Sequence, residues 1–239
     1  MAQTIKPSTV LPATRTPFKV TTEDGVTLVG EVARPLRPTR GALLMLHPNP
    51  AGGGMMDSHV YRKAANRLPE LADLTIVRFN TRGTTSDAGT STGSYDEGRS
   101  EKFDVEAIER YVFDDLKLEN VWIVGWSFGT NLALKHAKDS RHKGLILLSP
   151  TMMWTDPTEL LYWVKDGRPI TALVPEHDDY LKPDEAREVF KVIPQIKIIP
   201  VSGAKHLWVG EPMVHLVLDR KSTRLNSSHS QQSRMPSSA

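Results

Sequence analysis

The sequence predicts an α/β fold: a mostly parallel central sheet with helices on both faces and an antiparallel hairpin at its N-terminal end. Short apolar runs of strand length alternate along the chain with segments of helical periodicity. This alternation is typical of a parallel sheet that helices cover on both sides. Near the N-terminus, two strand-like runs are separated only by the turn signal Glu23-Asp24-Gly25, which predicts the hairpin.

The first half of the chain supplies the hairpin and the first strand-helix pairs. Each predicted strand is an apolar or β-branched run, and each predicted helix carries apolar residues on one stripe. In order, we expect hairpin strands at Phe18–Thr22 and Val26–Ala33, a strand at Gly41–Leu46, a helix at Ser58–Leu68, a strand at Leu74–Phe79, a long loop at Asn80–Arg99 and a helix capped by Ser100.

The second half continues the same alternation. We expect, in order, a strand at Val121–Val124, a helix at Asn131–Ala137, strands at Gly144–Ser149 and Ile170–Val174, a helix at Pro183–Val192, a strand at Gln195–Val201 and a last helix starting near Glu211. The segment Pro150–Arg168 is too short for a large lid. Its methionines and aromatic residues either pack in the core or line an open acyl pocket. The loop Asn80–Arg99 is expected to flank the mouth of that pocket, unless it is a solvated connector.

The chain divides into one domain and two end segments. Between residues 16 and 218 no repeat or linker interrupts the alternation, so we predict a single domain at 17–218 after a flexible arm at 1–16. Residues 219–229 resemble the translation of a common sequencing-library adapter, and residues 233–239 match its continuation. We therefore interpret 219–239 as an artefactual disordered tail and expect the natural C-terminus to be missing. The alternative is a natural serine-rich disordered tail.

Composition excludes several classes of protein. The 239 residues include no cysteine, which excludes disulfide scaffolds, thiolate metal sites and a cysteine nucleophile. Without the tail, 26 basic residues face 27 acidic ones, so charge does not indicate a nucleic-acid or membrane-surface partner. No apolar run approaches a membrane span of about 20 residues, and no secretory signal is present, so we expect a cytoplasmic protein.

A Gly-x-Ser-x-Gly motif stands where a buried strand turns into a helix. The motif is Gly125-Trp126-Ser127-Phe128-Gly129, directly after the apolar run Val121–Val124. This is the pattern of a nucleophile elbow, which exposes the serine hydroxyl at the carboxyl edge of a sheet. Glycine is expected at 125 and 129 because strand and helix backbones crowd together there. We predict that Ser127 is a catalytic nucleophile.

Hydrolases with a nucleophile elbow carry the serine first along the chain, then the acid and then the histidine, and this sequence offers candidates in that order. The loop after the strand at Gln195–Val201 contains His206, and the loop after Ile170–Val174 contains Asp178. Because the carboxyl ends of parallel strands meet at one sheet edge, both side chains are expected near Ser127. We predict that Asp178 and His206 are catalytic, although Glu176 or Asp179 could supply the acid instead.

Acyl transfer also needs donors for the developing oxyanion. We predict the backbone N–H groups of Phe128, which follows the nucleophile, and of Asn49, which lies between two prolines that lack an N–H. The alternative, a phosphate-binding loop at residues 52–54, lacks the spacing of known phosphate motifs. The histidines outside the proposed triad show no metal-ligand spacing, so we expect neither metal nor cofactor.

Three motifs together carry a family resemblance. They are His47-Pro48-Asn49-Pro50 with the glycines at 52–54, Arg78-Phe79-Asn80-Thr81-Arg82-Gly83, and the motif at Gly125–Gly129. With these motifs the chain resembles small bacterial serine hydrolases of the α/β-hydrolase superfamily. The resemblance implies the α/β-hydrolase fold and a triad that maps onto Ser127, Asp178 and His206, with Asn49 and Phe128 as oxyanion donors.

The function expected from these residues is hydrolysis of a carboxylic ester through an acyl-enzyme. The same triad could serve an acyltransferase, a thioesterase or an amidase. A third possibility is a non-catalytic binding protein on the same fold. Dienelactone-hydrolase relatives use a cysteine nucleophile, which this chain lacks, so their activity is not implied. The sequence gives no indication of the oligomeric state.

Overall fold

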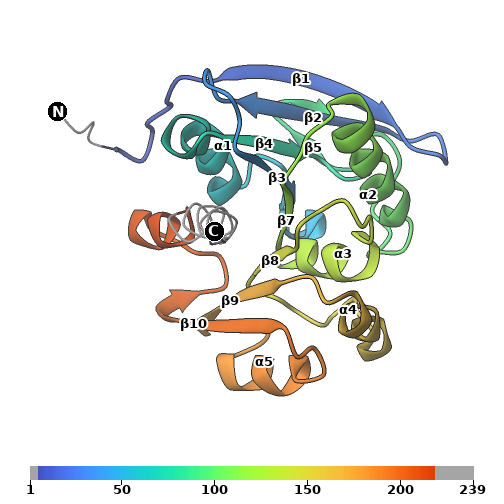
Figure 1. Ribbon diagram of the computed structural model, residues 1–239, viewed down its shortest axis with the longest axis vertical. Helices are drawn as coiled ribbons and strands as arrows, with labels where there is room; N and C mark the ends of the chain where they lie inside the picture. Colours follow the sequence, from blue (N-terminus) through green and yellow to red (C-terminus); the bar gives the residue numbers. More distant parts are fainter. Residues whose placement is uncertain (1–4, 219–239) are drawn as a thin grey trace, which may run out of the picture.

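Six neighbouring parallel strands form most of the eight-stranded sheet in the computed structural model, which describes residues 5–218 (Figure 1). The sheet order is β1-β2-β4-β3-β7-β8-β9-β10. The parallel strands are β3 (Gly41–Leu46), β4 (Leu74–Phe79), β7 (Val121–Trp126), β8 (Leu145–Leu148), β9 (Ile170–His177) and β10 (Ile196–Lys205). Because β3, β4 and β7 are buried along their whole length, their sequences are continuous apolar runs rather than alternating ones.

The predicted hairpin is present at one edge of the sheet. β1 (Thr14–Thr21) pairs with β2 (Thr27–Arg34), and β2 pairs antiparallel with β4. β1 can accommodate Pro17 because it is an edge strand. A separate two-stranded ribbon, β5 (Thr85–Ser86) with β6 (Gly89–Thr90), lies within the long loop.

The segment before β1 packs on the domain, although the sequence suggested an arm extending to residue 16. β1 already begins at Thr14, and Leu11 is buried. Nη2 of the buried Arg67 donates hydrogen bonds to the carbonyl oxygens of Lys6 and Pro7, at 3.0 and 3.2 Å. These contacts fix the described part of the expected arm, residues 5–16. The predicted tail, 219–239, lies outside the described residues.

Helices cover both faces of the sheet, as predicted (Figure 1). α1 (His59–Ala72) and helical residues 211–218 share one buried core with the sheet. The opposite core contains side chains of α2 (Glu101–Arg110), α3 (Phe128–His136), α4 (Leu161–Asp166) and α5 (Pro183–Phe190). The chain between β8 and β9 forms only a short 3₁₀ helix (Pro157–Leu160) and α4, so there is no large lid among the described residues.

One helix continues past its predicted end. α1 runs through Pro69 to Ala72, beyond the expected end at Leu68. A proline inside a helix removes the hydrogen bond to the carbonyl four residues earlier, here that of Ala65. Nη2 of Arg15 donates to this carbonyl at 3.1 Å. A side chain from β1 therefore replaces the bond that Pro69 cannot make.

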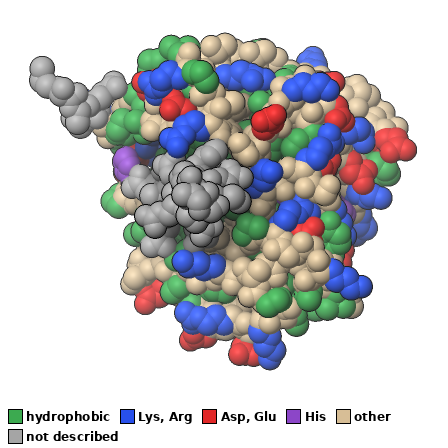
Figure 2. Space-filling model, viewed as in Figure 1, with side chains coloured by type: hydrophobic (Ala, Val, Ile, Leu, Met, Phe, Trp, Pro, Cys, Tyr) green, Lys and Arg blue, Asp and Glu red, His purple; other side chains and the backbone are tan. Residues whose placement is uncertain are grey.

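Charged side chains of both signs are visible on one face of the molecule (Figure 2). On the face shown in Figure 2, Lys and Arg are intermixed with Asp and Glu rather than gathered by sign. Within residues 5–218, no helix is long and apolar enough to cross a membrane. The same residues contain no group of three or more His, Asp and Glu side chains arranged to hold a metal ion.

Candidate active site

Ser127 stands at a strained turn between β7 and α3. Its backbone φ of 53° lies in the region that non-glycine residues rarely adopt. Its N–H donates to the carbonyl of Leu148 on β8 at 2.9 Å. A Cβ atom at Gly129 would overlap the carbonyl oxygen of Leu46, and one at Gly125 would overlap that of Gly129. The steric prediction for both glycines is therefore confirmed.

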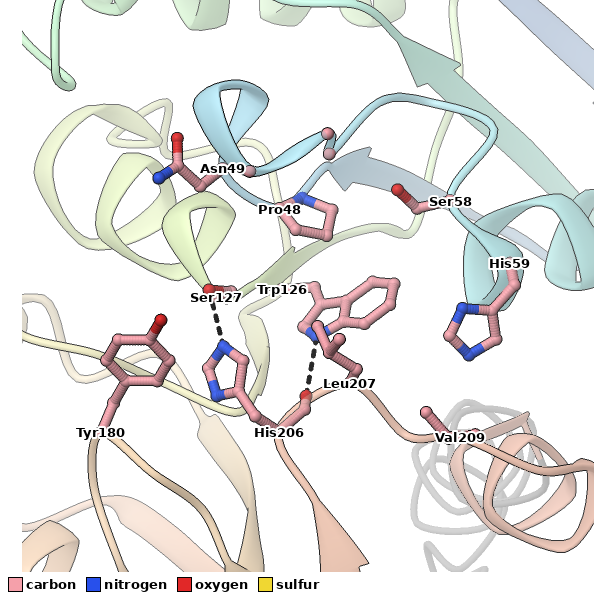
Figure 3. A pocket seen from close by; sticks show the side chains of 13 residues that line it. Pro48, Asn49, Ser58, His59, Trp126, Ser127, Tyr180, His206, Leu207 and Val209 are labelled. Atoms are coloured by element: carbon pink, nitrogen blue, oxygen red, sulfur yellow. Dashed lines mark hydrogen bonds between the residues drawn. The ribbon is translucent and has the colours of Figure 1, made fainter.

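The structure brings the three predicted catalytic residues together (Figure 3). Ser127 directly follows β7, Asp178 follows β9 and His206 follows β10. His206 Nε2 lies 2.9 Å from Ser127 Oγ, and its Nδ1 lies 3.0 and 2.9 Å from the two carboxylate oxygens of Asp178. Since a carboxylate only accepts, Nδ1 carries the hydrogen, and Nε2 can accept the serine proton.

The positions of the three candidate acids show which of them pairs with His206. Asp178 is 2% exposed and also accepts the N–H of Tyr180 at 2.9 Å, which holds its carboxylate toward His206. Glu176 is exposed and turns toward the next strand, where hydrogen bonds from Ser202 Oγ and the Gly203 N–H lower its pKa. Asp179 is exposed. Only Asp178 among these three contacts the imidazole.

Two side chains hold the loop that carries His206. Trp126 Nε1 and Ser149 Oγ both donate to the carbonyl oxygen of His206, at 3.2 and 2.8 Å. β10 itself extends to Lys205, past the predicted end at Val201, with a register shift between these two residues. This irregular extension delivers His206 to the sheet edge, and periodicity alone could not predict it.

The predicted oxyanion donors flank the serine. Phe128 is the first residue of α3, and Asn49 lies in the loop after β3 and lines the same cavity as Ser127. Within the described chain, neither backbone N–H donates to a protein acceptor. The Asn49 side chain is occupied locally, since its Oδ1 accepts the Ala51 N–H at 3.0 Å. Neither N–H is thus occupied by a partner in residues 5–218, and of the two residues Asn49 lines the cavity.

His47 anchors this loop from behind. It is fully buried; its Nδ1 lies 2.7 Å from the Pro48 carbonyl oxygen and its Nε2 accepts the Thr81 N–H at 3.0 Å. This pattern requires a neutral ring with the hydrogen on Nδ1. Burial lowers the pKa of His47 to about 4. His47 thus links the Asn49 loop to the Arg-Phe-Asn-x-Arg-Gly motif, a role that the sequence did not reveal.

Acid should therefore weaken the fold through His47. In the unfolded chain His47 has a pKa of about 6.5, so below that pH the unfolded state binds more protons than the native state. The contribution of the neutral His47 to the free energy of unfolding is therefore complete above pH 6.5 and is lost as the pH falls toward 4. We expect His47 alone to lower the free energy of unfolding by about 3 kcal/mol across this pH range. Urea unfolding at pH 7 and 4.5 should show a smaller acid loss in His47→Gln than in the wild type. Equal losses would contradict this assignment.

An open cavity of about 450 Å³ surrounds Ser127 and His206. Its described lining is Pro48, Asn49, Gly52, Gly53, Gly54, Ser58, His59, Trp126, Ser127, Tyr180, His206, Leu207 and Val209. Neither the loop at residues 80–99 nor the segment at 150–168 contributes to this lining. For the segment at 150–168 this favours the alternative of packing in the core, and the expectation that the loop at 80–99 flanks the pocket is not met at this cavity.

Those two segments have structural roles instead. Arg82 in the long loop pairs with Asp24 and with the buried Asp104, at 2.8 and 2.7 Å. Trp163, in the second segment, is buried, and its Nε1 donates to the Leu134 carbonyl at 2.9 Å. The apolar residues Leu160 and Trp163 thus belong to the core that contains α3.

Tyr180 and His59 are site residues that sequence reasoning missed. The ring of Tyr180 lies against His206, with centroids 4.5 Å apart. His59 is the first residue of α1 and lines the end of the cavity away from Tyr180 (Figure 3). No motif marks either residue.

The chain matches a known protein family. The sequence model for the alpha/beta hydrolase fold matches residues 41–198. A search of curated protein sequences finds no significant match.

Several solved structures resemble this one. An alpha-beta serine hydrolase homologue from Coxiella burnetii has a TM-score of 0.74 at 24% identity, covering 88% of this chain and 97% of its own. A lidless serine hydrolase from Xanthomonas campestris scores 0.70 at 22% identity, covering 95% and 99%. An esterase from Pyrococcus furiosus scores 0.73 at 17% identity, covering 94% and 98%. At these identities the likeness shows a shared fold.

Proposed function

The chain belongs to the alpha/beta hydrolase family, and we propose that it is a serine hydrolase that cleaves carboxylic esters through an acyl-enzyme on Ser127. One observation carries this proposal: the continuous hydrogen-bonded chain from Ser127 through His206 to Asp178. A serine hydroxyl becomes an effective nucleophile only when a positioned base takes its proton. The lidless cavity suits a small substrate that enters directly from solvent.

Acylation follows from the positions of the side chains. His206 Nε2 takes the proton as Ser127 Oγ bonds to the ester carbonyl carbon, and Asp178 stabilises the resulting imidazolium. The N–H groups of Phe128 and Asn49 donate to the carbonyl oxygen as it becomes negative. The tetrahedral intermediate then collapses. The carbon–oxygen bond to the alcohol breaks, and the imidazolium gives its proton to the departing oxygen.

Deacylation repeats these steps with water. His206 takes a proton from the water molecule that attacks the acyl carbon, and returns it to Ser127 Oγ when that bond breaks. The products are one carboxylic acid and one alcohol for each water consumed. Deposition of the acyl group on another acceptor would make the protein an acyltransferase.

Burst kinetics with 4-nitrophenyl butyrate test this proposal. We expect a rapid release of about one 4-nitrophenolate per protein molecule before the steady state, provided that deacylation is the slower step. Steady-state butyrate release then distinguishes hydrolysis from transfer when glycerol or an amine is added as a competing acceptor. The matching thioester and anilide reveal any thioesterase or amidase preference. Complete absence of turnover on all three substrates would contradict the proposal.

A further inference from the structure

The end of the cavity remote from Asn49 contains polar groups that the proposed reaction does not use. None of the described lining residues is Asp, Glu, Lys or Arg. Ser58 and His59, at the start of α1, are polar residues of this wall, which Trp126, Leu207 and Val209 otherwise make apolar (Figure 3). A charged substrate group would find no opposite charge among these side chains, so the wall fits a neutral group.

His59 presents a hydrogen-bond acceptor. Its Nε2 lies 3.2 Å from the carbonyl oxygen of Trp208, and a carbonyl cannot donate, so Nε2 carries the hydrogen. Burial lowers the pKa of His59, and the nearby Lys63 and Arg62 lower it further, so the ring is neutral at pH 7. The other nitrogen, Nδ1, therefore has a lone pair, and it has no hydrogen-bond partner within residues 5–218.

The ring is also held in place. It meets the indole of Trp126 edge to face, with centroids 5.4 Å apart and an interplanar angle of 84°. Together with the bond to Trp208, this contact fixes the imidazole from two sides. Ser58 adds a possible donor, because its Oγ accepts the Met55 N–H at 3.1 Å and leaves its own hydrogen available.

Reaction chemistry indicates which half of the ester reaches this wall. The alcohol oxygen must lie against His206 Nε2, since His206 returns the proton to it. Leu207 and Val209 continue the cavity wall from His206 toward the side on which His59 lies (Figure 3). An alcohol group that extends from the scissile oxygen along these residues reaches the imidazole of His59.

We propose that His59 is a specificity-determining residue whose Nδ1 accepts a hydrogen bond from a hydroxyl on the alcohol half of the ester. The preferred substrates are then hydroxyalkyl esters, such as 2-hydroxyethyl or glyceryl esters. This inference rests on the proposed esterase function. A plain alkyl group would displace water from Nδ1 and leave that acceptor unsatisfied, which disfavours it.

Two esters of equal size test this substrate class. Propyl butyrate and 2-hydroxyethyl butyrate differ only by a methyl group in place of the hydroxyl, and butyrate release measures kcat/KM for both. Because the two alcohols differ slightly in reactivity, the quantity of interest is the wild-type preference relative to that of a variant. We expect His59 to contribute a threefold to tenfold preference for the hydroxyalkyl ester, about what one neutral hydrogen bond provides.

Two substitutions distinguish the roles of the two nitrogens of His59. His59→Gln places an amide near Nε2, which preserves a donor for the Trp208 carbonyl but removes the acceptor at Nδ1. His59→Asn places an amide oxygen near Nδ1 but cannot reach Trp208. In His59→Gln we expect the preference for the hydroxyalkyl ester to fall to the ratio set by the reactivities of the two esters themselves. In His59→Asn we expect the preference to persist.

Three results would overturn the inference. The first is an equal ratio of kcat/KM for the two esters in the wild type and in His59→Gln. The second is a preference for the hydroxyalkyl ester that His59→Gln keeps and His59→Asn loses. The third is a stronger effect of a hydroxyl placed on the acyl half of the ester, measured with propyl 3-hydroxybutyrate. The second result would mean that His59 acts only by supporting the loop at Trp208. If Ser127→Ala abolishes hydrolysis but these ratios do not change, this inference fails while the proposed function stands.

Discussion

Alanine at position 127 is expected to lower kcat/KM for 4-nitrophenyl butyrate by about 10⁴-fold or more, because no other nucleophile occupies the elbow. The hydroxyl is the atom that His206 Nε2 contacts at 2.9 Å, and the substitution removes only that atom. The backbone can keep its strained φ of 53°, since alanine tolerates this conformation no worse than serine. Activity should therefore disappear while the fold remains.

Ser202→Ala is the matched control. Ser202 is exposed and donates to Glu176, outside the cavity lining. We expect its kcat/KM to stay within about twofold of the wild type, as is usual for surface substitutions. Circular dichroism and thermal unfolding should show that both variants are folded. If folded Ser127→Ala retained a tenth of the wild-type rate, the nucleophile would have to be another group.

Asn at position 178 is expected to lower kcat/KM by about 10³- to 10⁴-fold with little change in the fold. An asparagine amide can donate to Nδ1 of His206, whereas the carboxylate accepts from it. The imidazole hydrogen would then move to Nε2, and that nitrogen could no longer accept the proton of Ser127. The imidazolium would also lose its negative neighbour.

The neighbouring acids give this prediction its controls. Asp179→Asn and Glu176→Gln each remove one negative charge close to Asp178 in the chain, but neither side chain contacts His206. We expect both to keep kcat/KM within about threefold of the wild type, since exposed charges act weakly on a buried pair. The same ester assay measures all three variants. A greater loss in Asp179→Asn than in Asp178→Asn would move the acid to position 179.

The positions of the proposed catalytic residues were predictable because the fold itself brings them together. Ser127, Asp178 and His206 each follow a parallel strand, and the carboxyl ends of parallel strands share one edge. The choice among Glu176, Asp178 and Asp179 was not predictable. It depends on which way each side chain points where β9 ends at His177, three residues beyond the predicted strand end.

Residues that act through non-local contacts gave no sequence signal. His59 reaches the cavity because the start of α1 meets the loop after β10, and its partner Trp208 is 149 residues away in the chain. Similarly, Thr81 bonds to His47 behind the Asn49 loop, and Arg82 fixes the long loop to α2 through Asp104. Composition suggested that this loop flanked the cavity mouth, but composition cannot show which surface a loop covers.

Labelling with a fluorophosphonate probe, followed by mass spectrometry of the tryptic peptides, tests most directly whether Ser127 is the activated nucleophile. Such probes form a stable bond with a serine whose proton is taken by a positioned base. The structure predicts one adduct per protein molecule, located on Ser127, formed much more slowly in Asp178→Asn and absent from Ser127→Ala. No adduct on the folded wild-type protein, or an adduct on a different residue, would contradict this account.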